Sequence, residues 1–264
     1  MITNALSAGW TLGTHQVFAT RRKWLSVIVV LLPALVALPP RLFSGSPPAF
    51  IYGQLVMTLF TAILVPFVAI FWGGAVISDE VEGKTLVYLW TRPTGRMAVL
   101  ASKLVAVFFW QVLLLLAALL GVFLVLYAGR SSLTVQSELQ ALAWDLLGLG
   151  GGAAAYGALG FFLAALVKKP LGIGLVYIFA WDNIVNYLPG YLKMTSIRHF
   201  IMVLKSQGPS IEPKNQFTSF LAESTTTDAQ AITAISVVIV VCLGFAWALL
   251  HRKEYLGDDP ARSQ

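Results

Sequence analysis

Six long runs of apolar residues constrain the fold of this chain more than any other feature. They cover residues 24–40, 49–77, 104–128, 139–167, 170–188 and 231–250. A helix needs about 20 predominantly apolar residues to cross the hydrocarbon core of a bilayer. The runs therefore predict an all-α membrane protein with six transmembrane helices, organised as a single transmembrane domain over residues 1–264.

The composition supports a membrane protein over a soluble one. Of the 264 residues, 58% are hydrophobic and 11% are charged, whereas soluble domains carry about 25% charged residues. We interpret the net charge of +6 as a sign of membrane topology and expect no nucleic-acid partner. The single cysteine, Cys242, excludes a disulfide within the chain.

The distribution of basic residues predicts the orientation. With the N-terminus inside, twelve of the 18 Lys and Arg residues fall on cytoplasmic segments and six fall outside. Cytoplasmic loops carry an excess of Lys and Arg. We therefore expect a multi-pass protein with both termini in the cytoplasm.

Two segments outside the runs are predicted to have structure of their own. Residues 1–20 place Leu6, Trp10, Val17 and Phe18 near one face of a helix, as expected of an interfacial helix on the inner leaflet. Residues 189–228 form a long outer segment with helical spacing of apolar residues. We expect one or two short helices there, dipping into the outer interface.

The fourth run is rich in glycine. Gly148 and Gly152 make a small-xxx-small pair, and small residues let helix backbones approach closely. We interpret this pair as a site of tight helix packing.

The stretch SDEVEGKTLVYLWTRPTGR, residues 78–96, contains a Gly-Lys-Thr sequence like the end of a phosphate-binding loop. That loop requires an earlier glycine, five residues before Gly83, and a position between a strand and a helix. Ser78 occupies the required position and follows an apolar run. We therefore expect no ATP site and no bound cofactor in this chain.

The same stretch predicts a short amphipathic helix over residues 79–93. Acidic residues stand at its start, where a helix N-terminus favours anions, and an Arg-Pro pair ends it. Between them, apolar residues recur at helical spacing. The residues of this pattern are Asp79, Glu80, Glu82, Gly83, Thr85, Leu86, Leu89, Trp90, Arg92, Pro93 and Arg96.

With Lys103, this pattern resembles the signature of the membrane subunits of type-two ATP-binding cassette (ABC) exporters. Glu80, Glu82, Thr85, Arg92-Pro93, Arg96 and Lys103 occupy the positions of that signature. Lys84 departs from it, because many members have glycine next to the threonine. The six runs, the N-terminal helix and the long outer segment extend the resemblance over nearly the whole chain.

The resemblance implies a non-catalytic permease subunit that exports a substrate across the plasma (inner) membrane. A separate cytoplasmic ATPase would bind ATP and Mg and would receive residues 79–93 as a coupling helix. A second copy of the chain, or a similar permease, would complete the assembly in the bilayer.

Two acidic residues inside the runs are candidates for a transport pathway. Asp145 and Asp182, with Asn183 and Asn186, could line an outward vestibule, because acidic residues inside spans mark functional sites by default. The alternative is that each acid is hydrated near the interface, with Trp144 and Trp181 as anchors in the aromatic belt.

Three other functions compete with export. The first is an ABC-type subunit that transmits ATP-driven movement to a periplasmic partner without a defined cargo. The second is an intramembrane aspartyl protease that uses Asp145 and Asp182, and the third is a structural membrane protein. His15, His199 and His251 are scattered and do not predict a metal site.

Overall fold

A computed structural model describes residues 2–18, 22–43, 45–82, 96–128, 132–167, 169–182, 184–185, 191–205 and 227–252, and every regular element in these ranges is helical. The first half contains α1 (Ile2–Phe18), α2 (Lys23–Phe43), α3 (Pro48–Leu55), η1 (Val56–Leu64), α4 (Val65–Glu82) and α6 (Arg96–Tyr127). The second half contains α7 (Ser132–Leu166), α8 (Pro170–Val176), η2 (Tyr177–Asp182), η3 (Tyr191–Thr195), α10 (Ile197–Lys205) and α12 (Asp228–Arg252).

Five apolar helices are long enough to cross a membrane. They are Lys23–Phe43, Pro48–Glu80, Ala98–Tyr127, Leu142–Leu166 and Asp228–His251. These helices match five of the six predicted spans. The predicted span over 170–188 is represented only by the shorter apolar helix Pro170–Asp182, formed by α8 and the π-helix η2. Six full spans are therefore not confirmed, because residues 183 and 186–188 of the sixth predicted span lie outside the described residues.

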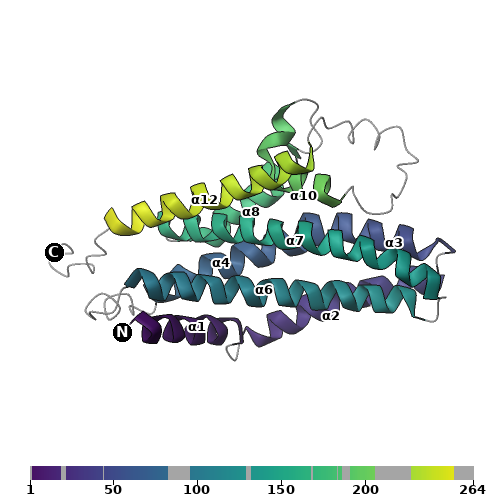
Figure 1. Cartoon of the computed structure of the whole chain (residues 1–264), viewed down its shortest axis with the longest axis horizontal. Helices are drawn as coiled ribbons and strands as arrows, with labels where there is room; N and C mark the ends of the chain where they lie inside the picture. The colour runs from purple at the N-terminus through teal and green to yellow at the C-terminus, as the bar shows by residue number, and fades with distance from the viewer. Residues whose placement is uncertain are drawn as a thin grey trace.

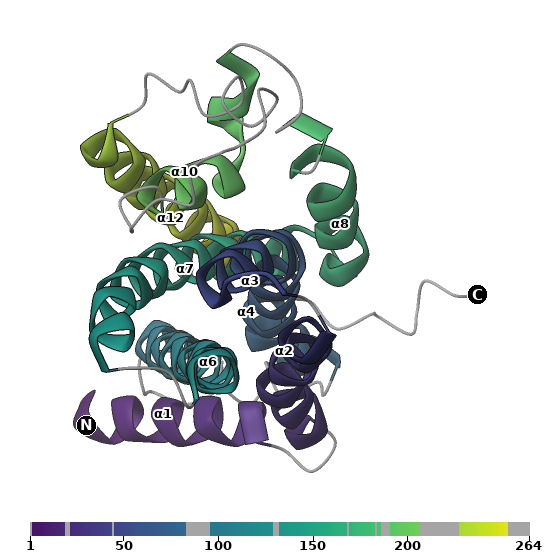
Figure 2. The same cartoon turned by 90° about the vertical axis from the view of Figure 1, so that its right-hand side faces the viewer.

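The long helices run side by side along the long axis of the molecule (Figure 1). Helix α1 and the C-terminal end of α12 lie at the same end, on the left, which we call the terminal end; the opposite end is the far end. In Figure 2, α1 is seen from its side, whereas α6 and α3 are seen close to end-on. Helix α1 therefore lies across the bundle, in the orientation expected of an interfacial helix.

The second apolar run is not one regular α-helix. It consists of α3, the π-helix η1 and α4, and Pro66 lies directly after η1. Proline has no N–H to donate and its ring clashes with the carbonyl of the preceding turn. The wider π-turns before Pro66 remove that conflict while the Thr61 hydroxyl donates to the carbonyl of Val56.

Helices α4 and α7 cross at the centre of the bundle through glycines. A Cβ atom on Gly73 would lie 2.3 Å from the carbonyl oxygen of Gly157, and one on Gly160 would lie 2.7 Å from that of Ile70. Trp72 and Tyr156 are fully buried beside this crossing. The two backbones are therefore close enough that no side chain fits between them.

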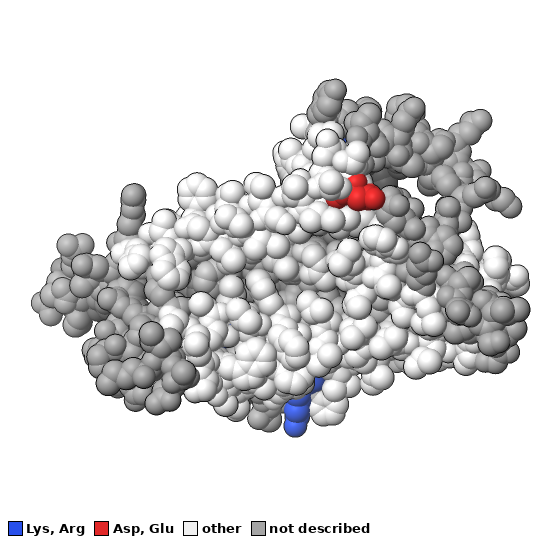
Figure 3. Space-filling model, viewed as in Figure 1, with Lys and Arg blue, Asp and Glu red and all other residues white. Residues whose placement is uncertain are grey.

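Helices α2 and α12 form the outside of the bundle. Of the most apolar stretch of each helix, 22% is buried in α2 and 11% in α12, against 67% in α7. The face shown in Figure 3 carries few charged side chains among the residues it describes. These helices present their apolar faces to the bilayer or to another protein chain.

The predicted long outer segment contains two short helices, η3 and α10, within the part that the structure describes. Helix α10 packs against α7, where a Cβ on Gly152 would clash at 2.2 Å with the side chain of Ile201. Gly148 lies under Leu204 in the same way. The predicted packing role of Gly148 and Gly152 is confirmed, although their partner is α10 and not a spanning helix.

We predict that Gly73→Ala destabilises the protein by about 1–3 kcal/mol, because its methyl group would displace the backbone of α7. Gly244→Ala is the matched control, since a Cβ there meets nothing within 4 Å. Without a clash, the same substitution in a helix is expected to stabilise by about 0.5–1 kcal/mol. Thermal unfolding of both variants in detergent tests this, and equal effects would contradict the glycine crossing.

Candidate functional site

The acidic residues of the predicted coupling segment stand in the last turn of α4. Asp79, Glu80 and Glu82 belong to this helix, which ends at Glu82. The structure therefore places them at the end of a long helix, and not at the start of a separate one as the sequence pattern suggested. Asp79 and Glu80 each have a cation within hydrogen-bond distance.

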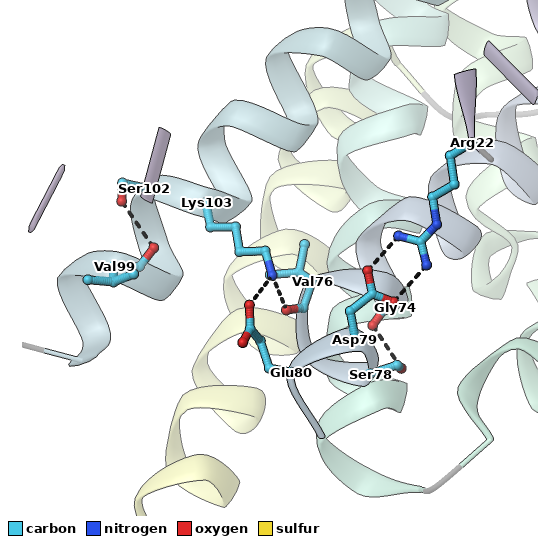
Figure 4. A network of polar contacts seen from close by, with 9 residues as sticks. All are labelled: Arg22, Gly74, Val76, Ser78, Asp79, Glu80, Val99, Ser102 and Lys103. Carbon is cyan, nitrogen blue, oxygen red and sulfur yellow. Dashed lines mark hydrogen bonds and ion pairs between the residues drawn. The ribbon is translucent and has the colours of Figure 1, made fainter. Parts of the chain in front are cut away.

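Arg22 supplies the first cation. Its Nη1 and Nη2 atoms donate to Oδ2 and Oδ1 of Asp79 over 2.5 and 2.7 Å, as Figure 4 shows. Arg22 also lies 5.5 Å from the centre of the Phe71 ring. This bidentate pair joins the chain just before α2 to the end of α4, in the geometry that arginine forms best with carboxylates.

Lys103 of α6 supplies the second cation. Its Nζ donates to Oε1 of Glu80 over 2.7 Å and to the carbonyl oxygen of Val76 over 3.1 Å (Figure 4). The Lys103 side chain is 4% exposed and that of Glu80 is 13% exposed, so this pair is nearly buried. It joins the two helices between which the coupling segment runs.

Helix α1 lies on the turn of α6 that carries Lys103. A Cβ on Gly9 would lie 1.8 Å from the Ser102 hydroxyl, and one on Gly13 would lie 2.7 Å from the Lys103 carbonyl. The Trp110 indole also donates to the Thr14 hydroxyl over 3.0 Å. The sequence did not lead us to expect this contact between α1 and α6, although the spacing of Gly9 and Gly13 is the small-xxx-small signal for close helix packing.

The other predicted coupling residues are placed only in part. Arg96 is the first residue of α6. Gly83, Thr85, Leu86, Leu89, Trp90, Arg92 and Pro93 lie outside the described residues. Their role as a coupling helix stays a prediction, and the structure fixes only the two helix ends that flank them.

Of the four candidate pathway residues, the structure describes Asp145 and Asp182. Asp182 contacts the hydroxyls of Tyr156 and Ser196, the latter over 2.5 Å. Tyr156 lies about three turns along α7 from Asp145, or roughly 16 Å at the rise of an α-helix. Both acids are buried, and Asn183 and Asn186 lie outside the described residues. This separation argues against a protease dyad, which needs two carboxylates that share a proton.

Comparison with known proteins identifies the family of the chain. A family described as ABC-2 family transporter protein matches residues 20–181, from just before α2 to the end of η2. The chain belongs to the ABC-2 transporter family. The matched region contains both ion pairs at the terminal end of the bundle.

Membership makes the chain a permease, that is, a membrane subunit of an ABC transporter. Members of this family act as membrane subunits and are generally not catalytic themselves. No curated protein matches the sequence. The α10 and α12 helices lie beyond the matched region.

We predict that the two ion pairs contribute unequally to the stability of the permease. Glu80→Gln or Lys103→Met leaves one charge in a nearly buried place and is expected to cost about 3 kcal/mol. Asp79→Asn is expected to cost about 1 kcal/mol or less, because the side chains of Arg22 and Asp79 are 27% and 32% exposed.

Unfolding of the single variants and of the Glu80→Gln/Lys103→Met double variant measures these costs. The double variant should be more stable than the sum of its two single changes predicts, because neither charge is left alone. Additive single changes would show that the two side chains do not interact.

Proposed function

We propose that this permease carries the transmembrane half of an ATP-driven exporter whose ATP is hydrolysed by a separate cytoplasmic ATPase. The ATPase would bind ATP and Mg, and residues 83–95 would contact it. The observation that carries the proposal is the pair of ion bridges that hold the turn of α4 just before this segment, one of them to α6 just after it, in a chain of the ABC-2 family.

The two ion pairs suggest how a movement of the ATPase would be passed on to the transmembrane helices. The Lys103–Glu80 contact ties the start of α6 to the end of α4, and the Arg22–Asp79 contact ties the start of α2 to the same turn. A force on residues 83–95 would therefore act on three helices together. The ion pairs would keep this force from moving the segment alone.

The terminal end would face the cytoplasm in this proposal. Arg22, Lys23 and Lys103 lie there, in agreement with the excess of basic residues on cytoplasmic segments. Helix α1 would lie on the inner leaflet, with Leu6, Trp10 and Phe18 exposed for contact with lipid. The membrane would be the plasma membrane, and both termini would be cytoplasmic.

The proposed assembly contains two permease chains and two ATPases. The apolar faces of α2 and α12 are large enough to contact both lipid and a second chain. Trp24, Leu35 and Leu42 on α2 are 65%, 61% and 70% exposed, and Val240 on α12 is 69% exposed.

Purification of the tagged permease from its native membranes tests the proposal. We expect an ABC ATPase to co-purify in equal amount and to hydrolyse ATP in the complex. A permease that is recovered alone under conditions that keep it folded would contradict the proposal. Movement of a defined molecule across sealed vesicles would further separate export from the transmission of movement to a periplasmic partner.

We predict that Glu82→Lys weakens the association with the ATPase by about tenfold or more, because like charges placed together at an interface cost several kcal/mol. Glu82 is the better choice for this test because Glu80 already contacts Lys103 and its loss would disturb the fold. Asp228→Lys, at the start of α12 at the far end, makes the same charge change as a control. Equal recovery of the ATPase with both variants would remove the coupling role.

A further inference from the structure

A buried polar cluster beside the α4–α7 crossing has no part in the contacts described at the terminal end. It joins Asp182 of η2, Tyr156 of α7, and the residues Ser196, Arg198 and His199 at the start of α10. All five are at least nine-tenths buried: Tyr156 and Ser196 are 0% exposed, Asp182 is 1% exposed, and Arg198 and His199 are 7% exposed.

We propose that this cluster is a latch: it holds α10 closed against α7, and α10 leaves α7 only when the latch is released. The proposal names Asp182 as a positioning residue. Only the link between release of the latch and ATP hydrolysis rests on the proposed function.

The Asp182 carboxylate holds the start of α10 in two ways. The Ser196 hydroxyl donates to it over 2.5 Å, and the backbone N–H of Arg198 also forms a hydrogen bond with it. The Ser196 oxygen in turn accepts from the backbone N–H of His199 over 3.3 Å. Asp182 and Ser196 together cap the first turn of α10, whose N–H groups have no partners inside the helix.

The charges of the cluster are balanced by Arg198. Its guanidinium interacts electrostatically with the Asp182 carboxylate. Burial, and to a lesser extent the charge of Lys193, lowers the pKa of His199. Asp182 and Arg198 thus bring one acidic and one basic group to the buried contact between α10 and the bundle.

The apolar contacts of α10 join the same two parts of the molecule. Ile201 fills the space above Gly152, and Leu204 lies over Gly148, both on α7. Ile201 is 1% exposed and Leu204 is 2% exposed. Asp182 is held to α7 through the Tyr156 hydroxyl, so the polar and the apolar contacts would break together if α10 moved away.

Two states of this contact are physically stable. In the closed state, each charged group has its partner in a buried place. In the open state, water can hydrate the same groups, whereas a half-open state would leave a charge buried without its partner and without water. A π-helix such as η2 is frequent at functional sites, and here it ends at Asp182.

The first experiment measures opening in the permease alone. With Cys242→Ala removing the only cysteine, Leu204→Cys introduces a thiol that a charged, water-soluble maleimide reaches only when α10 leaves α7. In nanodiscs, we expect Asp182→Asn to raise the rate of labelling by about tenfold, because hydrogen bonds to a charged group are lost. Tyr156→Phe and Ser196→Ala remove single contacts and should raise the rate by less.

Leu126→Cys on α6 is the control for general loosening. It is as buried as Leu204, at 2% exposure, and α6 has no part in the latch. Its rate of labelling should not change in the same variants. An unchanged rate at Leu204→Cys in all three latch variants, or an equal rise at Leu126→Cys, would overturn the latch.

The second experiment locks the contact. A Cβ on Gly148 would lie 3.6 Å from the Cβ of Leu204, which is within the range for a disulfide. In the complex with its co-purified ATPase, oxidised Gly148→Cys/Leu204→Cys should lower ATP turnover by at least about fivefold, and a reductant should restore it. Ala34→Cys/Gly121→Cys has the same 3.6 Å spacing between α2 and α6 and serves as the control.

The outcomes separate the latch from the proposed function. Full ATP turnover in the oxidised Gly148→Cys/Leu204→Cys complex would show that the contact never opens during the cycle, and would overturn the latch. If no ATPase co-purifies, the proposed function fails. The labelling of Leu204→Cys then decides whether the Asp182 cluster holds α10 against α7.

Discussion

The structure of this permease depends on the close approach of α4 and α7. In a bilayer, the apolar side chains of a helix gain little by leaving lipid, so helices associate through close packing and through polar contacts. The glycines at 73 and 160 allow this packing at the centre of the bundle, and Gly157 leaves room for the Phe108 ring of α6. Helix α6 packs against both helices, and its Gln111 amide donates to the carbonyl of Ala153 on α7. Helices α2 and α12 lie outside this group and keep most of their apolar surface exposed.

Polar contacts lie at both ends of this packed centre. At the terminal end, Arg22 and Lys103 hold the last turn of α4. At the far end, Arg41 donates to the carbonyls of Val125 and Ala128 and so caps the end of α6. Beside the crossing, Asp182 connects α7 to the start of α10. In the proposed transporter, force from the ATPase would reach α4 first. The α4–α7 crossing would then carry the movement to Tyr156 and the latch, since two backbones in contact cannot move independently.

The sequence alone could predict most of the helices but few of the contacts. Length and hydropathy located five of the spans, because a bilayer imposes a minimum apolar length on any spanning helix. The sixth span, over residues 170–188, stays a prediction, because residues 183 and 186–188 lie outside the described part of the chain. The acidic and basic residues of the candidate site were also visible in the sequence. Their pairing was not, since Arg22 is 57 positions from Asp79 and nothing local indicates that they meet.

What the sequence determined by itself is the class of the protein: a helical membrane protein whose segment between two long apolar runs carries the acidic and Arg-Pro pattern of ABC permeases. Only the tertiary structure decided which acid meets which cation, that α1 lies on the turn carrying Lys103, and that Asp182 caps α10. The physical reason is that hydropathy acts on each segment separately and can be read along the chain. Ion pairs and glycine contacts depend on how segments distant in sequence pack against one another.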